Sequence, residues 1–360
     1  MRAWSLVVGL GIALVAAGAI WSGTSSRDYL FDLTEGETIH LPPIDADLTV
    51  KSATVEFHEG TNRASRYAAT LEFSGDQPTE VETTVNNPAR FRGHTFYLSG
   101  IQGQSGRASV SLIARRNPAW VFLLIAFAVL DLGVLGFVVT LVRRGRGQGP
   151  PTTKGEQWLR YAALALLFGG TALLVQRAFA AGHLPFANMY EALLFFGTAT
   201  LVFLAFTRDT SITGVAIAIA LGVTLFLLPA RLSVPRPLMP ALQSPWFGPH
   251  VALAFLGYGG LLAAVISPRR GAALPIAFAC FTVAMTLGAV WAEIAWARFW
   301  SWDPKETWSL VTWLLMATAL GMRLFGHKRV EKVLAAIALA TVLYNFVIVN
   351  VVLRGLHSYK

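Results

Sequence analysis

Six of the eleven tryptophans in this chain of 360 residues lie between Trp291 and Trp313. Within that segment, the run Trp300-Ser-Trp-Asp-Pro-Lys-Glu-Thr-Trp308 places both signs of charge among the indoles. Indole rings offer broad apolar faces and one N–H donor, which suits a flat, mostly apolar ligand with an anionic edge. The carboxylates of such a ligand could pair with Lys305 or Arg298. The alternative is an aromatic belt, because tryptophan is enriched where a membrane meets water.

Two histidines lie at the ends of apolar runs on either side of this segment. His250 opens the second run before the tryptophan-rich loop, and His357 closes the second run after it. These runs could bring two imidazoles to opposite faces of one planar ligand. Neutral imidazole binds haem iron well, and paired axial histidines are a common haem arrangement. For each histidine, the alternative is a solvated side chain at a helix end.

The elements that must position these residues are strongly apolar. Hydrophobic residues make up 54% of the chain and charged residues 14%, whereas a soluble domain carries about a quarter charged residues. About 20 apolar helical residues cross a hydrocarbon core. Such runs cover residues 3–21, 120–142, 158–180, 189–206, 212–229, 250–267, 273–296, 307–325 and 333–353. We therefore predict an all-α polytopic membrane bundle of about nine transmembrane helices, with one small external β-rich domain.

The net charge of +9 is interpreted as a signal of topology. Basic residues gather in short loops around residues 143–154, 269–270 and 323–332, which lie on one side if nine helices alternate. This is the positive-inside pattern, so the basic excess does not indicate nucleic-acid binding. The N-terminus is then inside. The segments predicted outside are residues 22–118, 181–187, 230–249, 297–306 and 354–360.

The long outer segment has the character of β-strands. Residues 53–57, 67–73, 80–85 and 108–112 roughly alternate apolar and polar side chains, with turn-forming Gly, Asn and Pro between them. The predicted division is an anchor (1–22), an external β-rich domain (23–118), a transmembrane helix (119–143), a cytoplasmic linker (144–157) and a helical membrane domain (158–360). The first segment is interpreted as a retained anchor, with a cleaved signal peptide as the alternative.

Two further residues stand out inside apolar runs. Asp131 is a carboxylate within such a run, which indicates either a functional role or a hydrogen bond to a neighbouring helix. Cys280 is the only cysteine of the chain and is interpreted as a buried structural residue. With one cysteine, the chain offers no pair of thiols for redox exchange.

The C-terminal half resembles the CcsA/ResC (CcsBA-type) cytochrome c assembly proteins, within a haem-handling group that shares a tryptophan-rich "WWD" motif. The matching pieces are residues 182–185, 188–191, 240–244 with His250, 287–292, 300–308 and the Gly-Leu-His-Ser-Tyr run 355–359. They cover about residues 155–360. Residues 85–93 and 95–97 are similar to the segment before the last helix of ResB-type partner proteins. The chain therefore resembles a fusion of a truncated ResB with a CcsA.

The resemblance implies that haem b reaches an external site, where His250 and His357 ligate its iron. It also implies that its vinyl groups are then presented to the two thiols of a Cys-x-x-Cys-His segment of apocytochrome c. The predicted haem-binding residues are His250, His357, Trp296, Trp300, Trp302, Asp303 and Trp308. The predicted supporting residues are His183, Glu191, Arg298, Lys305 and Glu306. Further partners implied are a full-length ResB-type protein and a thiol reductant protein, in a bacterial plasma membrane with the active face outside.

The sequence departs from the family pattern at an inner haem site. Gly321 stands where the family has a histidine, and a second inner histidine belongs to an early ResB helix that precedes the matched part. A smaller departure is Ala292-Glu-Ile-Ala295, where the family usually has Ala-Asn-Glu-Ala. Two alternatives to a cytochrome c haem lyase, or a subunit of one, therefore stay open. They are a haem chaperone that forms no thioether bonds, and a scaffold of the assembly complex that binds no haem.

Overall fold

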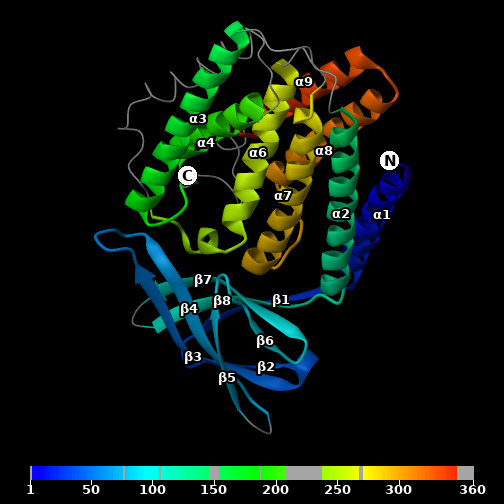
Figure 1. Ribbon diagram of the computed structural model, residues 1–360. Helices are drawn as coiled ribbons and strands as arrows, with labels where there is room; N and C mark the ends of the chain where they lie inside the picture. Colours follow the sequence, from blue (N-terminus) through cyan, green and yellow to red (C-terminus); the bar gives the residue numbers. More distant parts are fainter. Residues whose placement is uncertain are drawn as a thin grey trace.

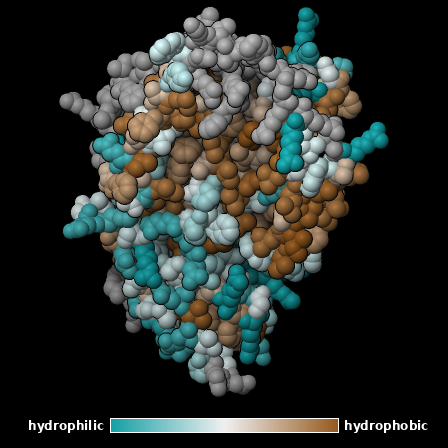
Figure 2. All heavy atoms as spheres, in the orientation of Figure 1, coloured by the Kyte–Doolittle hydropathy of each residue, from teal (hydrophilic) through white to brown (hydrophobic). Residues whose placement is uncertain are grey.

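The computed structural model describes residues 2–75, 78–104, 107–145, 154–186, 188–206, 237–266 and 271–346. These ranges contain eight α-helices and eight β-strands. The strands form a separate β-domain between the first two helices, and this domain lies against one end of the helical bundle (Figure 1). Hydrophilic side chains cover the β-domain, while apolar side chains gather over the bundle (Figure 2).

The β-domain consists of two antiparallel four-stranded sheets that pack face to face. One sheet has the order β1-β8-β7-β6 and the other β2-β3-β4-β5. Both sheets contribute to one hydrophobic core, in which Val50, Phe73, Phe96 and Val110 are fully buried. The strands are β1 (Arg27–Thr34), β2 (Thr38–Leu41), β3 (Ala46–Phe57), β4 (Ala64–Phe73), β5 (Thr79–Thr84), β6 (Ala89–Phe91), β7 (His94–Gln104) and β8 (Arg107–Arg116).

Only half of these strands are evident in the sequence pattern. The four segments expected to be strands lie on β3, β4, β5 and β8. Strand β1 was missed because most of its side chains are exposed and it shows no alternation, and β6 because it is three residues long. The outer segment therefore forms a β-sandwich that is larger than the sequence indicated.

The described helices follow the predicted apolar runs closely. Two of them, at 189–206 and 273–296, have the predicted bounds, while the run 212–229 lies outside the described residues. The helices are α1 (Arg2–Ser25), α2 (Trp120–Gly145), α3 (Lys154–Ala181), α4 (Met189–Phe206), α6 (Phe247–Ile266), α7 (Ala273–Trp296), α8 (Pro304–Leu324) and α9 (Lys328–Tyr344).

The prediction of about nine transmembrane helices is wrong. Among the described residues, five helices are long and apolar enough to cross a membrane: Arg2–Ser25, Trp120–Arg143, Tyr161–Ala181, Phe247–Ile266 and Ala273–Trp296. Helix α8 carries Lys305 and Glu306 near its start and Arg323 near its end, and α9 is 17 residues long with four charged residues among its first five. Helix α4 is apolar but short. The apolar runs were recognised correctly, but the number of spans was not.

Helices α1 and α2 form a close hairpin that tethers both ends of the β-domain. A Cβ added at Gly11 of α1 would lie 2.6 Å from the Cα of Leu130, and one at Gly136 of α2 would lie 2.4 Å from the Trp4 ring. Glycine at such positions lets helix backbones approach closely in a membrane. The chain passes from α1 into β1, and from β8 into α2, through short connections.

Candidate functional site

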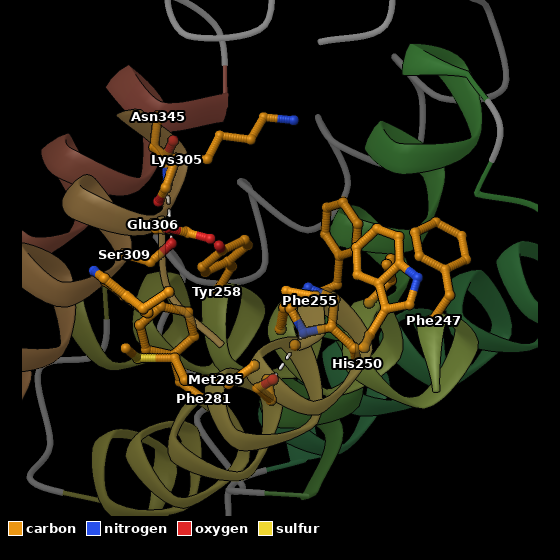
Figure 3. Close-up of a pocket in the computed structure, with 18 of the residues that line it drawn as sticks. Phe247, His250, Phe255, Tyr258, Phe281, Met285, Lys305, Glu306, Ser309 and Asn345 are labelled. Atoms are coloured by element: carbon orange, nitrogen blue, oxygen red, sulfur yellow. Dashed lines mark hydrogen bonds between the residues drawn. The ribbon is translucent and has the colours of Figure 1, made fainter. Parts of the chain in front are cut away.

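A cavity of about 190 Å³ lies between α6, α7 and α8 (Figure 3). Its walls are mostly apolar, as in typical ligand sites, with a few polar groups among them. The aromatic wall residues are Phe247, Phe255, Tyr258, Phe281, Trp291, Phe299, Trp300 and Phe346. The polar wall residues are His250, Lys305, Glu306, Ser309 and Asn345.

His250 enters the cavity wall from the first turn of α6 (Figure 3). Its Nδ1 lies 2.7 Å from the carbonyl oxygen of Ala284 on α7. A carbonyl can only accept a hydrogen bond, so Nδ1 carries the proton and the lone pair of the neutral ring is on Nε2. A metal-binding histidine is commonly oriented in this way by a backbone carbonyl.

Helix α7 passes His250 at a glycine. A Cβ added at Gly288 would lie 2.6 Å from Cε1 and 2.7 Å from Nδ1 of the imidazole. No side chain larger than hydrogen fits there without displacing the ring. Trp291, one turn further along α7, lies with its ring centroid 6.0 Å from that of His250. The histidine is therefore confined between α6 and α7.

The tryptophan-rich loop between α7 and α8, residues 297–303, is hereafter the Trp loop. Ala297 and Trp302 have φ values of 61° and 58°, a left-handed conformation that is uncommon for residues other than glycine. The loop ends in a capping box: the side chain of Asp303 accepts from the backbone N–H of Lys305, and Glu306 accepts from that of Asp303. Glu306 also accepts from Ser301 N–H at 2.7 Å. These bonds fix the end of the loop.

The predicted tryptophan platform divides into different environments. Only Trp300 lines the cavity, and its buried Nε1 has no hydrogen-bond partner among the described residues. Trp296 packs on Trp291 at 4.7 Å between ring centroids, and Trp308 packs on Tyr344 at 4.6 Å. Trp302 is 69% exposed. The structure thus places Trp300 in the wall of the same cavity as His250, and the other three behind or outside this wall.

The polar end of the cavity is formed by Lys305, Glu306, Ser309 and Asn345. Burial lowers the pKa of Lys305 to about 8, against the opposing effect of the Asp303 carboxylate. Asn345 donates from Nδ2 to Lys305 O at 3.1 Å and to Ser309 Oγ at 3.2 Å. Its buried Oδ1 has no partner in the described part of the chain. This end therefore combines a cation with an unsatisfied acceptor.

The other predicted supporting residues lie away from the cavity. Glu191 is fully buried and pairs with Arg177 of α3 at 2.8 Å. His183 lies in the connection after α3, with Nδ1 at 2.8 Å from Leu184 O. Arg298 is 60% exposed, and its Nη2 is 3.8 Å from Asp28 of the β-domain. His357 lies outside the described residues.

Several wall residues were not among the predicted site residues. Trp291 is 2% exposed and donates from Nε1 to Ala241 O, which holds the short 3-10 helix η3 (Pro240–Gln243). Asn345 and Tyr258 gave no signal, because their contribution depends on how α9 and α6 are rotated. Gly288 and Trp291 both lay in the stretch 287–292 that matched the family, and this was a signal for them.

The β-domain contacts the segment of the cavity wall that precedes α6. Asn86 donates to Pro240 O at 2.6 Å, and His58 Nε2 lies 3.0 Å from Leu238 O. Gln243 in turn donates to Ser65 O at 2.9 Å. Since Met239 and Leu242 line the cavity, the β-domain supports this part of its wall.

Asp131 and Cys280 both lie on helices of the bundle, and neither lines the cavity. Asp131 of α2 accepts a hydrogen bond from Thr286 of α7 at 3.2 Å, which is the contact with a neighbouring helix that was one of its two interpretations. Cys280 is partly buried in α7.

Together, the fold and the site define a multi-pass membrane protein with an aromatic-lined cavity beside a β-sandwich. The cytochrome c assembly protein family matches residues 186–267 and 272–357, and the ResB-like family matches residues 11–194. The chain therefore belongs to the cytochrome c assembly protein family, and its N-terminal half is ResB-like. The ResB-like match is longer than the segment 85–97 in which the sequence resembled ResB-type proteins, and it includes the whole β-domain.

Individual relatives bear the name cytochrome c biogenesis protein CcsA. The protein from Synechococcus sp. (strain CC9605) is 31% identical over 294 residues, which cover 64% of this chain and 96% of that protein. The one from Synechococcus sp. (strain WH7803) is 30% identical over 312 residues, covering 68% and 95%. The one from Chlamydomonas reinhardtii is 32% identical over 225 residues, covering 52% of this chain and 64% of that protein.

Proposed function

We propose that this protein acts in cytochrome c biogenesis by binding haem in the cavity between α6, α7 and α8. The observation that carries this proposal is His250: it lines an aromatic cavity, and Ala284 O fixes the tautomer with its lone pair on Nε2. A histidine presented in this form is a suitable axial ligand for haem iron. The similarity to proteins named for cytochrome c biogenesis points to the same role.

The wall chemistry also suits haem, taken here as haem b. Its flat apolar macrocycle would pack against Phe255, Trp291 and Trp300, which line the cavity. Its anionic propionate groups would meet Lys305 and the unpaired N–H of Trp300. His357 is proposed as the second axial ligand. Trp296, Trp302, Asp303 and Trp308 would act indirectly, by packing behind the wall or shaping the Trp loop.

The bound haem is proposed to be the substrate for covalent attachment to apocytochrome c. Each thiol of a Cys-x-x-Cys-His segment would add across one vinyl group, so that sulfur bonds to one carbon and the proton goes to the other. This addition consumes no oxidant, but it needs reduced thiols, for which a separate thiol reductant protein is proposed. The chain would contribute mainly by holding the vinyl groups near the thiols.

A relay function is the second candidate, and Gly321 favours it. This residue stands where the family has an inner histidine, and a Cβ added there would meet nothing within 4 Å. A haem chaperone would receive and pass on haem without forming thioether bonds, together with a full-length ResB-type protein. We place either function at the outer face of a bacterial plasma membrane. Residues 158–360 would form the haem-handling domain, and residues 23–118 the external domain.

The test is the absorption spectrum of the reduced protein, purified in mild detergent from cells supplied with haem. We expect a low-spin haem spectrum in the wild type that is lost or shifted in His250→Ala and in His357→Ala. His327→Ala is the matched control, because His327 is exposed at the start of α9 and should leave the spectrum unchanged. A wild-type protein without any haem absorbance would refute haem binding and would favour the alternative of a scaffold that binds no haem.

A further inference from the structure

Arg115 of the β-domain contacts the first residue of the Trp loop. Its side chain is buried, and Nη1 donates a hydrogen bond to the carbonyl oxygen of Ala297. Ala297 is the C-cap of α7 and has the left-handed φ of 61° that turns the chain into the loop. A β-domain residue therefore holds the turn at the start of the loop that carries Trp300.

Arg115 is itself paired with an acidic group of the β-domain, and a second acidic residue lies close by on α7. Its Nε lies 3.5 Å from Asp28 of β1, the residue paired with it across the sheet. On the bundle side, Glu293 is 3% exposed and lies one helical turn before Ala297, whose N–H donates to Glu293 O at 3.0 Å. Charges are buried at such a cost that they are normally paired.

Two further β-domain residues turn toward the same carboxylate. Tyr97 donates to Glu293 Oε1 at 3.5 Å, and Asn117 donates to the same oxygen at 3.4 Å. Burial and then the Glu293 carboxylate raise the pKa of Tyr97, so its hydroxyl keeps the proton that it donates. The junction of Arg115, Tyr97 and Asn117 with Glu293 and Ala297 thus fixes the end of α7 against the β-domain.

The Trp loop is in this way anchored at both ends. Arg115 holds Ala297 at its start, and Glu306 binds Ser301 and Asp303 at its end. Trp300, the one loop tryptophan that lines the cavity, lies between the two anchors. The second anchor is built into α8, whereas the first exists only while the β-domain is docked.

We propose that Arg115 is a positioning residue that sets the Trp loop, and with it Trp300, in the wall of the cavity. The identity of the ligand rests on the proposed function, but the ordering of the loop does not. Loss of Arg115 should loosen the loop in the haem-free protein and, as a consequence, weaken ligand binding.

The test is hydrogen–deuterium exchange of the haem-free protein in detergent, read at the amides of residues 298–302. We expect Arg115→Ala to speed exchange there by about 10-fold or more, the factor that loss of a charge-assisted hydrogen bond provides. Arg115→Lys should recover part of the protection. Arg116→Ala is the matched control, because Arg116 is the next residue and is exposed. Equal exchange in Arg115→Ala and Arg116→Ala would overturn the proposal.

A second variant covers a failure of Arg115→Ala to fold. Glu293→Gln keeps the shape of the side chain but replaces the carboxylate that Tyr97 and Asn117 contact, and should speed exchange in the same amides by a smaller factor. Unchanged exchange in this variant would contradict the proposal. A wild type that never binds haem would refute the proposed function, while these exchange rates would still decide the role of Arg115.

Discussion

Replacement of Gly288 by alanine tests how closely α7 confines the proposed haem ligand. The new Cβ would lie 2.6 Å from Cε1 and 2.7 Å from Nδ1 of His250, so the ring must move. Moving it would break the Nδ1 hydrogen bond to Ala284 O, which contributes about 1 kcal/mol. Overpacking adds about 1–3 kcal/mol. We therefore expect about 2–4 kcal/mol of destabilisation at the site, shared between folding and ligand binding.

Two measurements follow the effect of Gly288→Ala: haem content by absorption of the reduced protein, and the Tm in detergent. The haem dissociation constant should rise by roughly 10-fold to 100-fold, since each 1.4 kcal/mol corresponds to a factor of ten. Gly321→Ala is the matched control, because its Cβ meets nothing within 4 Å and alanine favours a helix by about 1 kcal/mol. A Gly288→Ala protein with the haem affinity and Tm of the wild type would refute the confinement of His250.

Two further predictions concern charged groups. Burial lowers the pKa of Lys305 to about 8, so the charge that attracts an anionic ligand is lost as the pH rises through that value. Haem affinity, measured by titration, should therefore fall by about 10-fold or more between about pH 7 and pH 10. A Lys305→Met variant should lack this pH dependence. Glu191→Ala leaves the buried Arg177 charge without its carboxylate partner and should lower the free energy of unfolding by about 3–5 kcal/mol. The measurement is the Tm, which should fall, while the haem spectrum should change little. A Tm equal to that of the wild type would show that this pair is solvated.

The sequence predicted the positions of helices better than the number of membrane spans. Apolar runs mark where helices form, and 273–296 coincides with α7. Whether a helix spans also depends on polar groups within it. Thr312 of α8 bonds to Thr341 of α9 at 2.8 Å, and charged residues lie at the start of both helices. The five helices that qualify as spans are longer than α9 and, unlike α8, reach the required mean hydropathy, so length and charge must be weighed together with the apolar run.

At the site, residue types were more predictable than their directions. His250, Trp300, Lys305 and Glu306 were all expected near the ligand and line the cavity. The directions of Trp296 and Trp308 depend on how α7 and α8 are rotated, and that of Trp302 on the path of the Trp loop, which begins with Ala297 in a left-handed conformation that no motif predicts.

One local signal at the site went unused. Asp303 and Glu306 have the spacing of a capping box, which predicts that the aspartate caps the N-terminus of a helix. The role of this carboxylate as a helix cap could therefore have been predicted from the sequence.

The hairpin of α1 and α2 has a consequence for how strong the domain junction needs to be. Because these helices tether the β-domain at both its ends, the Arg115 contact forms within one molecule, at an effective concentration on the order of millimolar. A few polar contacts then suffice to keep the domain seated. If the ResB-like half and the cytochrome c assembly half were separate proteins, they would have to associate from dilute solution. A far larger interface would then be needed to keep the β-domain docked and the Trp loop ordered.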